Sequence, residues 1–177
     1  MMDSSHSKTR IKCLVWDLDN TLWDGVLLES ATLPPLRPHV REVIEALDQR
    51  GILQSLASKN ETEPVMAALA AHGLDQYFLY PKISWNAKSE SIAKIAEQLN
   101  IGIDTFAFID DQPFERDEVL SVHPSVRVFT DAQVESLLVL EDFVPLHLTK
   151  DSKNRREMYQ KEEQRTKAQD DFKGPQD

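Results

Sequence analysis

Short apolar segments alternate along this chain with amphipathic segments of about a dozen residues, and each kind has its own periodicity. Strands alternating with helices form right-handed βαβ units around a parallel sheet. The predicted fold class is therefore α/β, with a central parallel sheet flanked by helices. The predicted strands are residues 11–16, 52–57, 77–80, 105–109 and 126–129, and the predicted helices are 38–47, 61–72, 88–99, 114–122 and 131–140.

Residues with strong local preferences set several of these boundaries. Pro38 favours the first turn of a helix, and Gly51 is a natural stop for the same helix. Asp131 is a predicted N-cap for the helix that runs to Leu140. Residues 23–38 mix apolar and turn residues and are too few for a second domain, so a loop or short hairpin is expected.

Length and composition limit the domain count and the classes of partner. A chain of 177 residues fits one domain with a short appendage, and 41% hydrophobic and 28% charged residues are typical of a globular protein. We expect a flexible segment at 1–10, an α/β domain at 11–148, and a charged helix and tail at 149–177, frayed from Ala168 onward. A formal net charge of −10 argues against nucleic acid and anionic membranes as partners, since both attract positive surfaces.

The cellular compartment is expected to be the cytoplasm. The single cysteine, Cys13, cannot form an internal disulfide, which suits a reducing environment. No apolar run approaches the roughly 20 residues that a membrane-spanning helix needs. The first ten residues are polar and lack the apolar core of a secretory signal.

Polar side chains follow three of the predicted strands where each strand ends. Asp17 and Asp19 follow the first, Ser58 follows the second, and Asp110 and Asp111 follow the fourth. Ligands bind at the carboxyl ends of parallel strands. Carboxylates brought together there need a cation or a proton between them, which suits either a magnesium site or acid catalysis. The simpler interpretation is that residues 19–21 only form a turn.

Four segments, taken together and in order, resemble the motifs of the haloacid dehalogenase (HAD) superfamily. They are Asp17-Leu18-Asp19-Asn20-Thr21, Ser58, Lys88 at the start of a predicted helix, and Phe108-Ile109-Asp110-Asp111 with Glu115 four residues past Asp111. The resemblance implies a single Rossmann-like core with a minimal cap, dependence on Mg²⁺, and phosphoryl-group chemistry.

The chain is most similar to the FkbH-like branch of that superfamily, over residues 11–165. The family transfers a glyceryl group from 1,3-bisphosphoglycerate to an acyl carrier protein, with release of phosphate, in polyketide biosynthesis. Larger members carry additional domains that are absent from this sequence. The segments that carry the resemblance, besides the first motif, are Lys12-Cys13-Leu14-Val15, Ser58-Lys59-Asn60-Glu61, Trp85-Asn86-Ala87-Lys88-Ser89-Glu90, Asp110-Asp111-Gln112-Pro113-Phe114-Glu115-Arg116 and Met158-Tyr159-Gln160.

The resemblance also implies a role for each site residue. Asp17 is expected to be the nucleophile or a magnesium ligand, and Asp19 the general acid and base, with its backbone carbonyl on the metal. Asp111 is expected to bind the metal, and Asp110 to hold one of the metal's waters. Ser58 and Lys88 are expected to bind the transferring phosphoryl group, supported by Thr21 and Asn60.

Several residues leave alternatives open. Lys88 could instead open a surface helix, and Glu115 could lie near the metal or be an exposed acid. Trp85 could fill the core or line the site, and Trp23 could face the substrate, whereas Trp16 is expected in the core. Cys13 could carry an acyl group, but it lies four residues before Asp17 along the strand, about 13 Å away, so a core role is expected. The five histidines, at 6, 39, 72, 123 and 147, lack metal-ligand spacing.

Neither of the usual insertion points of HAD enzymes has room for a cap domain. An open site suits a macromolecular partner such as a carrier protein. We therefore expect glyceryl transfer, with two alternatives: a small magnesium-dependent phosphatase acting on another phosphoester, and a non-catalytic interaction module that kept the fold.

Overall fold

The computed structural model describes residues 9–172 and contains a five-stranded sheet in the order β3-β2-β1-β4-β5. Every adjacent pair of strands is parallel, so the carboxyl ends of all five lie at one edge. This confirms the predicted α/β class with a parallel sheet. The strands are β1 (Cys13–Trp16), β2 (Leu53–Ser58), β3 (Lys82–Ile83), β4 (Phe106–Ile109) and β5 (Arg127–Phe129).

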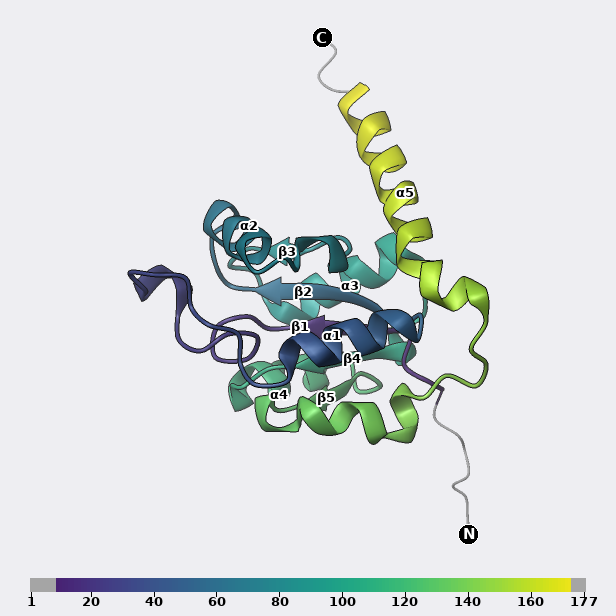
Figure 1. Ribbon diagram of the computed structural model, residues 1–177, viewed down its shortest axis with the longest axis horizontal. Helices are drawn as coiled ribbons and strands as arrows, with labels where there is room; N and C mark the ends of the chain where they lie inside the picture. Colours follow the sequence, from purple (N-terminus) through teal and green to yellow (C-terminus); the bar gives the residue numbers. More distant parts are fainter. Residues whose placement is uncertain (1–8, 173–177) are drawn as a thin grey trace.

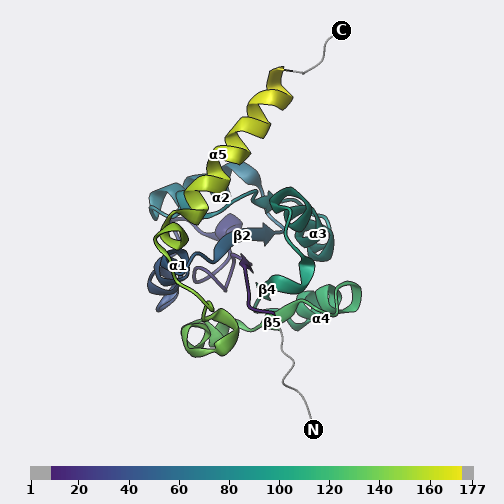
Figure 2. The same ribbon diagram turned by 90° about the vertical axis from the view of Figure 1, so that its right-hand side faces the viewer.

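Helices cover both faces of this sheet (Figure 2). One face packs against α1, α2 and short 3₁₀ turns that follow β5, and the other packs against α3 and α4. The α-helices are α1 (Val40–Gln49), α2 (Thr62–Ala71), α3 (Lys88–Leu99), α4 (Pro113–Val122) and α5 (Lys150–Phe172). Within residues 9–172, no helix is both long and apolar enough to span a bilayer.

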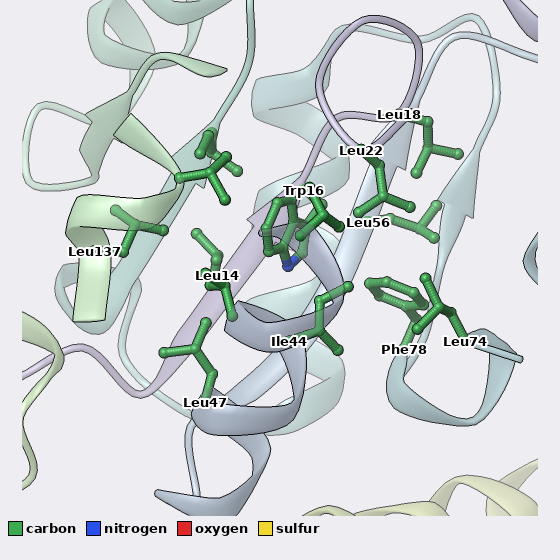
Figure 3. Packing of buried hydrophobic residues seen from close by; sticks show 14 of the residues in the cluster. Leu14, Trp16, Leu18, Leu22, Ile44, Leu47, Leu56, Leu74, Phe78 and Leu137 are labelled. Atoms are coloured by element: carbon green, nitrogen blue, oxygen red, sulfur yellow. The ribbon is translucent and has the colours of Figure 1, made fainter. Parts of the chain in front are cut away.

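Strand β1 is the centre of the hydrophobic core. Its four residues are fully buried, and alternate side chains enter the two hydrophobic clusters on opposite faces of the sheet. Figure 3 shows Leu14 and Trp16 beside Ile44 and Leu47 of α1. The Trp16 indole N–H donates to Gln54 Oε1 at 2.9 Å, which satisfies its polar group within the core.

The third predicted strand, at 77–80, is wrong except for one isolated parallel bridge between Phe78 and Gln54. Residues Asp75–Tyr77 form a 3₁₀ turn, and β3 lies at Lys82–Ile83 instead. Leu79 is buried and its N–H donates to the Gln54 carbonyl at 2.9 Å, but Tyr80 has a φ of +46° and ends any extended run. The apolar residues here fill the core from a loop.

The helix predicted from Asp131 to Leu140 is also wrong. The segment forms 3₁₀ helices at Asp131–Gln133 and Glu135–Val139, and Thr130, not Asp131, is the N-cap through a capping box. Val134 and Leu137 are buried three residues apart, a spacing that matches three residues per turn. A 3₁₀ turn therefore directs both side chains toward the core.

Helix α5 packs against α1 with its first half and then extends away from the body of the protein (Figure 1). Arg156 forms a bidentate ion pair with the buried Asp48 of α1, at 2.8 and 3.3 Å. Tyr159 packs against the core, whereas Met158 is 61% exposed. The helix runs through Phe172, so the expected fraying from Ala168 is wrong for the described residues.

The start of α5 also constrains the turn between α1 and β2. Gly51 has a φ of +77°, and a Cβ atom at this position would lie 2.9 Å from the Ser152 carbonyl oxygen. Only glycine fits the close approach of these two segments.

Most of the predicted flexible segment lies outside the described residues. Its last two residues are held by hydrogen bonds: the Thr9 carbonyl accepts one from Arg127 at 2.6 Å, and Arg10 donates to the Glu141 carbonyl at 2.6 Å.

Candidate active site

The carboxyl edge of the sheet brings three acidic side chains into one cluster. Carboxylate oxygens of Asp17, which follows β1, and of Asp110 and Asp111, which follow β4, lie within 4.8 Å of one another. The adjacency of β1 and β4 produces this proximity, because the residues that follow two paired parallel strands emerge side by side. Asp17 and Asp110 are buried, whereas Asp111 is partly exposed.

Lys88 lies between two of these carboxylates. Its Nζ donates to Asp17 Oδ1 and to Asp110 Oδ2, each at 2.7 Å, and the residue is only 4% exposed. The first residue of α3 therefore points into the cluster, because Ile92 and Ile95 anchor the same helix against the sheet. A surface role for Lys88 is wrong.

Burial and charge act against each other in this cluster. Burial raises the pKa of Asp17 and of Asp110, although the neighbouring Lys88 opposes the rise for both. Burial alone would lower the pKa of Lys88, but the charges of Asp17 and Asp110 outweigh it and the net shift is upward. Lys88 therefore stays protonated between two carboxylates that are costly to ionise.

Thr21 connects the first motif with the fourth. Its Oγ1 lies 2.8 Å from Asp17 Oδ2 and 3.1 Å from Asp111 Oδ1, and it accepts a hydrogen bond from the Asp111 N–H at 3.1 Å. Thr21 is fully buried, so this single hydroxyl fixes the relative positions of the two acids.

Asp19 is held apart from the carboxylate cluster. Its Oδ1 accepts hydrogen bonds from the Trp23 indole at 2.8 Å and from the Leu27 N–H at 3.0 Å. Its Oδ2 accepts one from Asn60 at 3.2 Å. The side chain is thus positioned beside the cluster, as an acid–base group requires.

Trp23 belongs to the site, but its role, donating a hydrogen bond to Asp19, was not predicted from the sequence. It is fully buried and stacks on His72, so the idea that it faces the substrate is wrong. The four-residue spacing from Asp19 was the available signal, because the turn at Leu18 brings Trp23 back over Asp19.

Ser58 and Asn60 lie at the end of β2 on the same edge, and both are buried. Asn60 Nδ2 lies 3.4 Å from Ser58 Oγ, and its Oδ1 accepts a hydrogen bond from the Glu61 N–H at 3.0 Å. Asn60 thereby connects Ser58 with Asp19. All eight predicted site residues thus lie at one edge of the sheet.

Glu115 is buried, so the alternative that it is an exposed acid is wrong. Its Oε2 lies 3.1 Å from Lys59 Nζ, and among the described residues its Oε1 has no hydrogen-bond partner. Trp85 is 65% exposed and Phe114 is 69% exposed, so Trp85 does not fill the core.

Cys13 lies at the opposite end of β1 from Asp17. It is fully buried, and burial raises the pKa of its thiol well above the ordinary range. A buried neutral thiol is a poor nucleophile, which supports the predicted core role.

The loop between β1 and α1 borders the site without covering it as a domain would. Residues 17–39 contain one short 3₁₀ turn, Leu27–Glu29, and project beyond the carboxyl edge (Figure 1). Arg37 donates to the Asn20 carbonyl within the loop, and it ties the loop to the body through Asp131 at 2.5 Å.

The donor set at this edge fits a hard divalent cation. Asp17, Asp110 and Asp111 offer carboxylate oxygens, the ligand type that Mg²⁺ prefers. One ammonium group, that of Lys88, balances one of the three acids, so the other two need a cation or a proton between them.

No protein-family model matches the chain, and no curated protein matches it. Among solved structures, it is similar to the N-terminal part of a Bacteroides fragilis protein that contains a phosphatase domain and was solved with Mg. The TM-score is 0.64 at 27% identity, over 82% of this chain and 42% of that one. This chain therefore spans less than half of that protein's solved part.

Two further solved structures show the same fold at lower identity. One is a HAD-superfamily hydrolase of subfamily IA from Geobacter sulfurreducens, with a TM-score of 0.56, 15% identity, and coverage of 72% of this chain and 96% of that one. The other is the cobalt-bound deoxy-D-mannose-octulosonate 8-phosphate phosphatase of Haemophilus influenzae, with a TM-score of 0.51, 16% identity, and coverage of 91% and 94%. The chain therefore shares its fold with hydrolases and phosphatases of the HAD superfamily.

Proposed function

We propose that this chain is a magnesium-dependent phosphatase of the HAD type that acts on a phosphorylated small molecule. The observation that carries the proposal is the buried Lys88 ammonium held between Asp17 and Asp110, with Asp111 beside them at the carboxyl edge. A phosphatase domain bound to Mg in the Bacteroides fragilis structure and a sugar-phosphate phosphatase in Haemophilus influenzae support the same activity.

The proposed reaction has two displacements at phosphorus. An Asp17 carboxylate oxygen attacks the phosphoryl group and the bond to the leaving oxygen breaks, while Asp19 gives that oxygen a proton. Asp19 then accepts a proton from water, which attacks the phosphorylated Asp17 and releases inorganic phosphate. Asp17 and Asp19 both return to their starting states.

The remaining residues hold and neutralise the transferring group. Lys88 places a fixed positive charge against the phosphoryl oxygens in a site that is poorly screened by water. Ser58 and Asn60 would donate hydrogen bonds to the same group, and the Thr21 hydroxyl, 2.8 Å from Asp17, would keep that carboxylate in position. Bound Mg²⁺, held by Asp17, Asp110 and Asp111 with the Asp19 carbonyl, would neutralise charge that develops on the phosphoryl group.

The first test measures phosphate release from a panel of phosphomonoesters with Mg²⁺. We expect release by the native chain and a loss of at least about a hundredfold in Asp17→Asn, since the nucleophile is removed. Asp170→Asn, an exposed substitution on α5, is the matched control and should retain activity. Equal activity in Asp17→Asn would contradict the assignment of the nucleophile.

A finer proposal is that the chain transfers the glyceryl group of 1,3-bisphosphoglycerate to an acyl carrier protein. It is supported by the resemblance to FkbH-like sequences and by two exposed aromatic side chains, Trp85 three residues before Lys88 and Phe114 three residues after Asp111, which could contact a large partner. The short loop at 17–39 leaves the edge open to such a partner.

Mass spectrometry separates the two proposals. The protein is incubated with Mg²⁺, 1,3-bisphosphoglycerate and a holo carrier protein, and the carrier is weighed. A glyceryl adduct that is lost in Asp17→Asn supports transfer, whereas phosphate release without an adduct supports the simple phosphatase. If neither the adduct nor free phosphate forms, and Mg²⁺ does not change the thermal stability, the chain is better explained as a non-catalytic interaction module.

A further inference from the structure

An ion pair crosses the carboxyl edge of the sheet beside the proposed active site. Lys59 follows the last residue of β2, and Glu115 lies in the first turn of α4, which follows β4. Strand β1 separates β2 from β4, so the pair spans the strand that leads into Asp17. The two charged groups are 3.1 Å apart.

Burying the Glu115 carboxylate in this ion pair carries an unusually large free-energy cost. Its side chain is 8% exposed, and its Oε1 has no hydrogen-bond partner among the described residues. Burying a carboxylate with one oxygen unsatisfied is unfavourable, and such groups are rare in native structures. Stabilisation of α4 alone does not account for Glu115, because a neutral side chain would avoid the cost.

The Lys59 half retains capacity for another partner. An ammonium group has three donors, and Glu115 accepts one of them. The Lys59 side chain is 32% exposed, and its Nζ lies 5.9 Å from the centre of the exposed Phe114 ring, which restrains its position. Lys59 therefore presents an oriented, partly exposed positive charge at the carboxyl edge, one residue after Ser58, whereas Lys88 is buried in the acidic cluster.

The acidic groups near Lys59 make its positive charge important for the choice of substrate. Asp17, Asp19, Asp110 and Asp111 are acidic groups of the same edge. A substrate with a negative group beyond its phosphoryl group is repelled by these acids unless a positive charge lies where that group projects.

We propose that Lys59, positioned by Glu115, binds a second anionic group of the substrate, a carboxylate or a further phosphate. The site then selects phosphomonoesters whose alcohol part is itself negatively charged. This inference rests on the proposed phosphatase function and names its substrate class. Lys59 is the binding residue and Glu115 is a positioning residue.

The test compares two substrates of the same carbon skeleton, 3-phosphoglycerate and glycerol 3-phosphate, which differ by one carboxylate. We expect the native protein to show the lower KM for 3-phosphoglycerate. In Lys59→Met, the KM for 3-phosphoglycerate should rise by about tenfold, the value of one charge-assisted hydrogen bond, and the KM for glycerol 3-phosphate should change much less. Lys59→Arg should restore part of the difference.

Two further variants separate positioning from stability. Glu115→Gln keeps the shape of the side chain and removes its charge, so the preference for 3-phosphoglycerate should fall several-fold without a loss of thermal stability. A purely structural role for Glu115 would instead lower stability and leave the preference unchanged. Lys161→Met, an exposed substitution on α5, is the matched control and should preserve the preference.

Binding measured by calorimetry tests this inference independently of the proposed phosphatase activity. Dissociation constants of both compounds are measured with Mg²⁺ on Asp17→Asn protein that carries either Lys59 or Lys59→Met. Binding that favours 3-phosphoglycerate only with Lys59 supports the inference, even if the native protein hydrolyses neither compound and the phosphatase proposal fails. Hydrolysis by the native protein without a preference that depends on Lys59 overturns the inference and supports the phosphatase. If the protein neither binds nor hydrolyses either compound, both the inference and the phosphatase proposal are overturned.

Discussion

Lys88 is the residue on which the electrostatics of the site depend. One buried ammonium group is hydrogen-bonded to two buried carboxylates, at 2.7 Å each. Such an arrangement is stable only while every charge has its partner, because desolvated charges attract and repel strongly.

Replacing Lys88 with methionine should therefore affect both stability and activity. Without Mg²⁺, we expect a loss of about 3 kcal/mol in the free energy of unfolding, since Asp17 and Asp110 lose their shared cation. Denaturant unfolding checks this value, and phosphate release should fall by at least about a hundredfold. Added Mg²⁺ should stabilise the variant more than the native protein, and an unchanged unfolding midpoint in EDTA would contradict this account.

In the proposed reaction, the hydrogen bond from the Trp23 indole to Asp19 serves catalysis more than folding. Trp23→Phe keeps an aromatic ring in the core and removes the N–H that donates to Asp19 at 2.8 Å. We expect kcat to fall by about tenfold, because Asp19 loses one of three donors that position it. Circular dichroism at the assay temperature measures the folded fraction of the variant. The fall in kcat should be larger than any fall in that fraction.

Individual site residues differ in how well their positions could be predicted from the sequence. Asp17, Ser58, Lys88 and Asp110 could be placed at one edge because each follows or begins a strongly periodic element. The orientation of Asp19, by contrast, depends on a turn that reverses the chain within four residues. Glu115 was ambiguous because periodicity cannot show that Lys59, more than 50 residues earlier, covers it.

At the scale of single elements, α3 shows when local pattern is sufficient. The predicted range 88–99 matches Lys88–Leu99, because the apolar spacing, the absence of internal breakers and the left-handed Asn100 all agree. The strand expected at 77–80 failed because a short apolar run also describes a buried loop, and only the positive φ of Tyr80 separates the two.

Several polar contacts attach α5 to the body, and the ion pair between Arg156 and Asp48 is one of them. Arg156→Met should lower the free energy of unfolding by about 3 kcal/mol, because Asp48 is buried beneath it and would lose its cation. Thermal denaturation measures the effect. Arg165→Met is the control, since its ion pair with Glu162 is exposed and should contribute little.

A second contact of α5 should make stability depend on pH. Burial raises the pKa of Glu163, although the Tyr80 N–H that it accepts and the charges of Lys167 and Lys82 oppose the rise. An acid whose folded pKa is raised favours its neutral form, so its contribution to stability is present below the unfolded pKa and is lost as pH rises through the folded pKa. Glu163→Gln should therefore gain stability relative to the native protein between about pH 4 and pH 7. Denaturant unfolding at both pH values checks the sign, and a relative loss on raising the pH would refute it.

The whole molecule is acidic, with a formal net charge of −10, and its proposed metal site concentrates part of that charge. A divalent cation that binds the folded state alone stabilises it by mass action. At a Mg²⁺ concentration about a hundred times its dissociation constant, the gain should be about 2.7 kcal/mol, which a rise in Tm relative to EDTA would show. Asp111→Asn should reduce that rise, and an equal rise in this variant would place the ion elsewhere.

The central position of β1 has a consequence for motion during turnover. The Asp17 N–H donates to the Ile109 carbonyl at 3.0 Å, and the strand before it is buried on both faces. Amides so placed exchange with solvent only when the protein opens globally, so this carboxylate is attached to the least mobile part of the backbone. In the proposed reaction, incoming molecules would therefore adjust to a stationary Asp17 carboxylate, and any rearrangement that admits or releases them would occur in the loops beyond the strand ends.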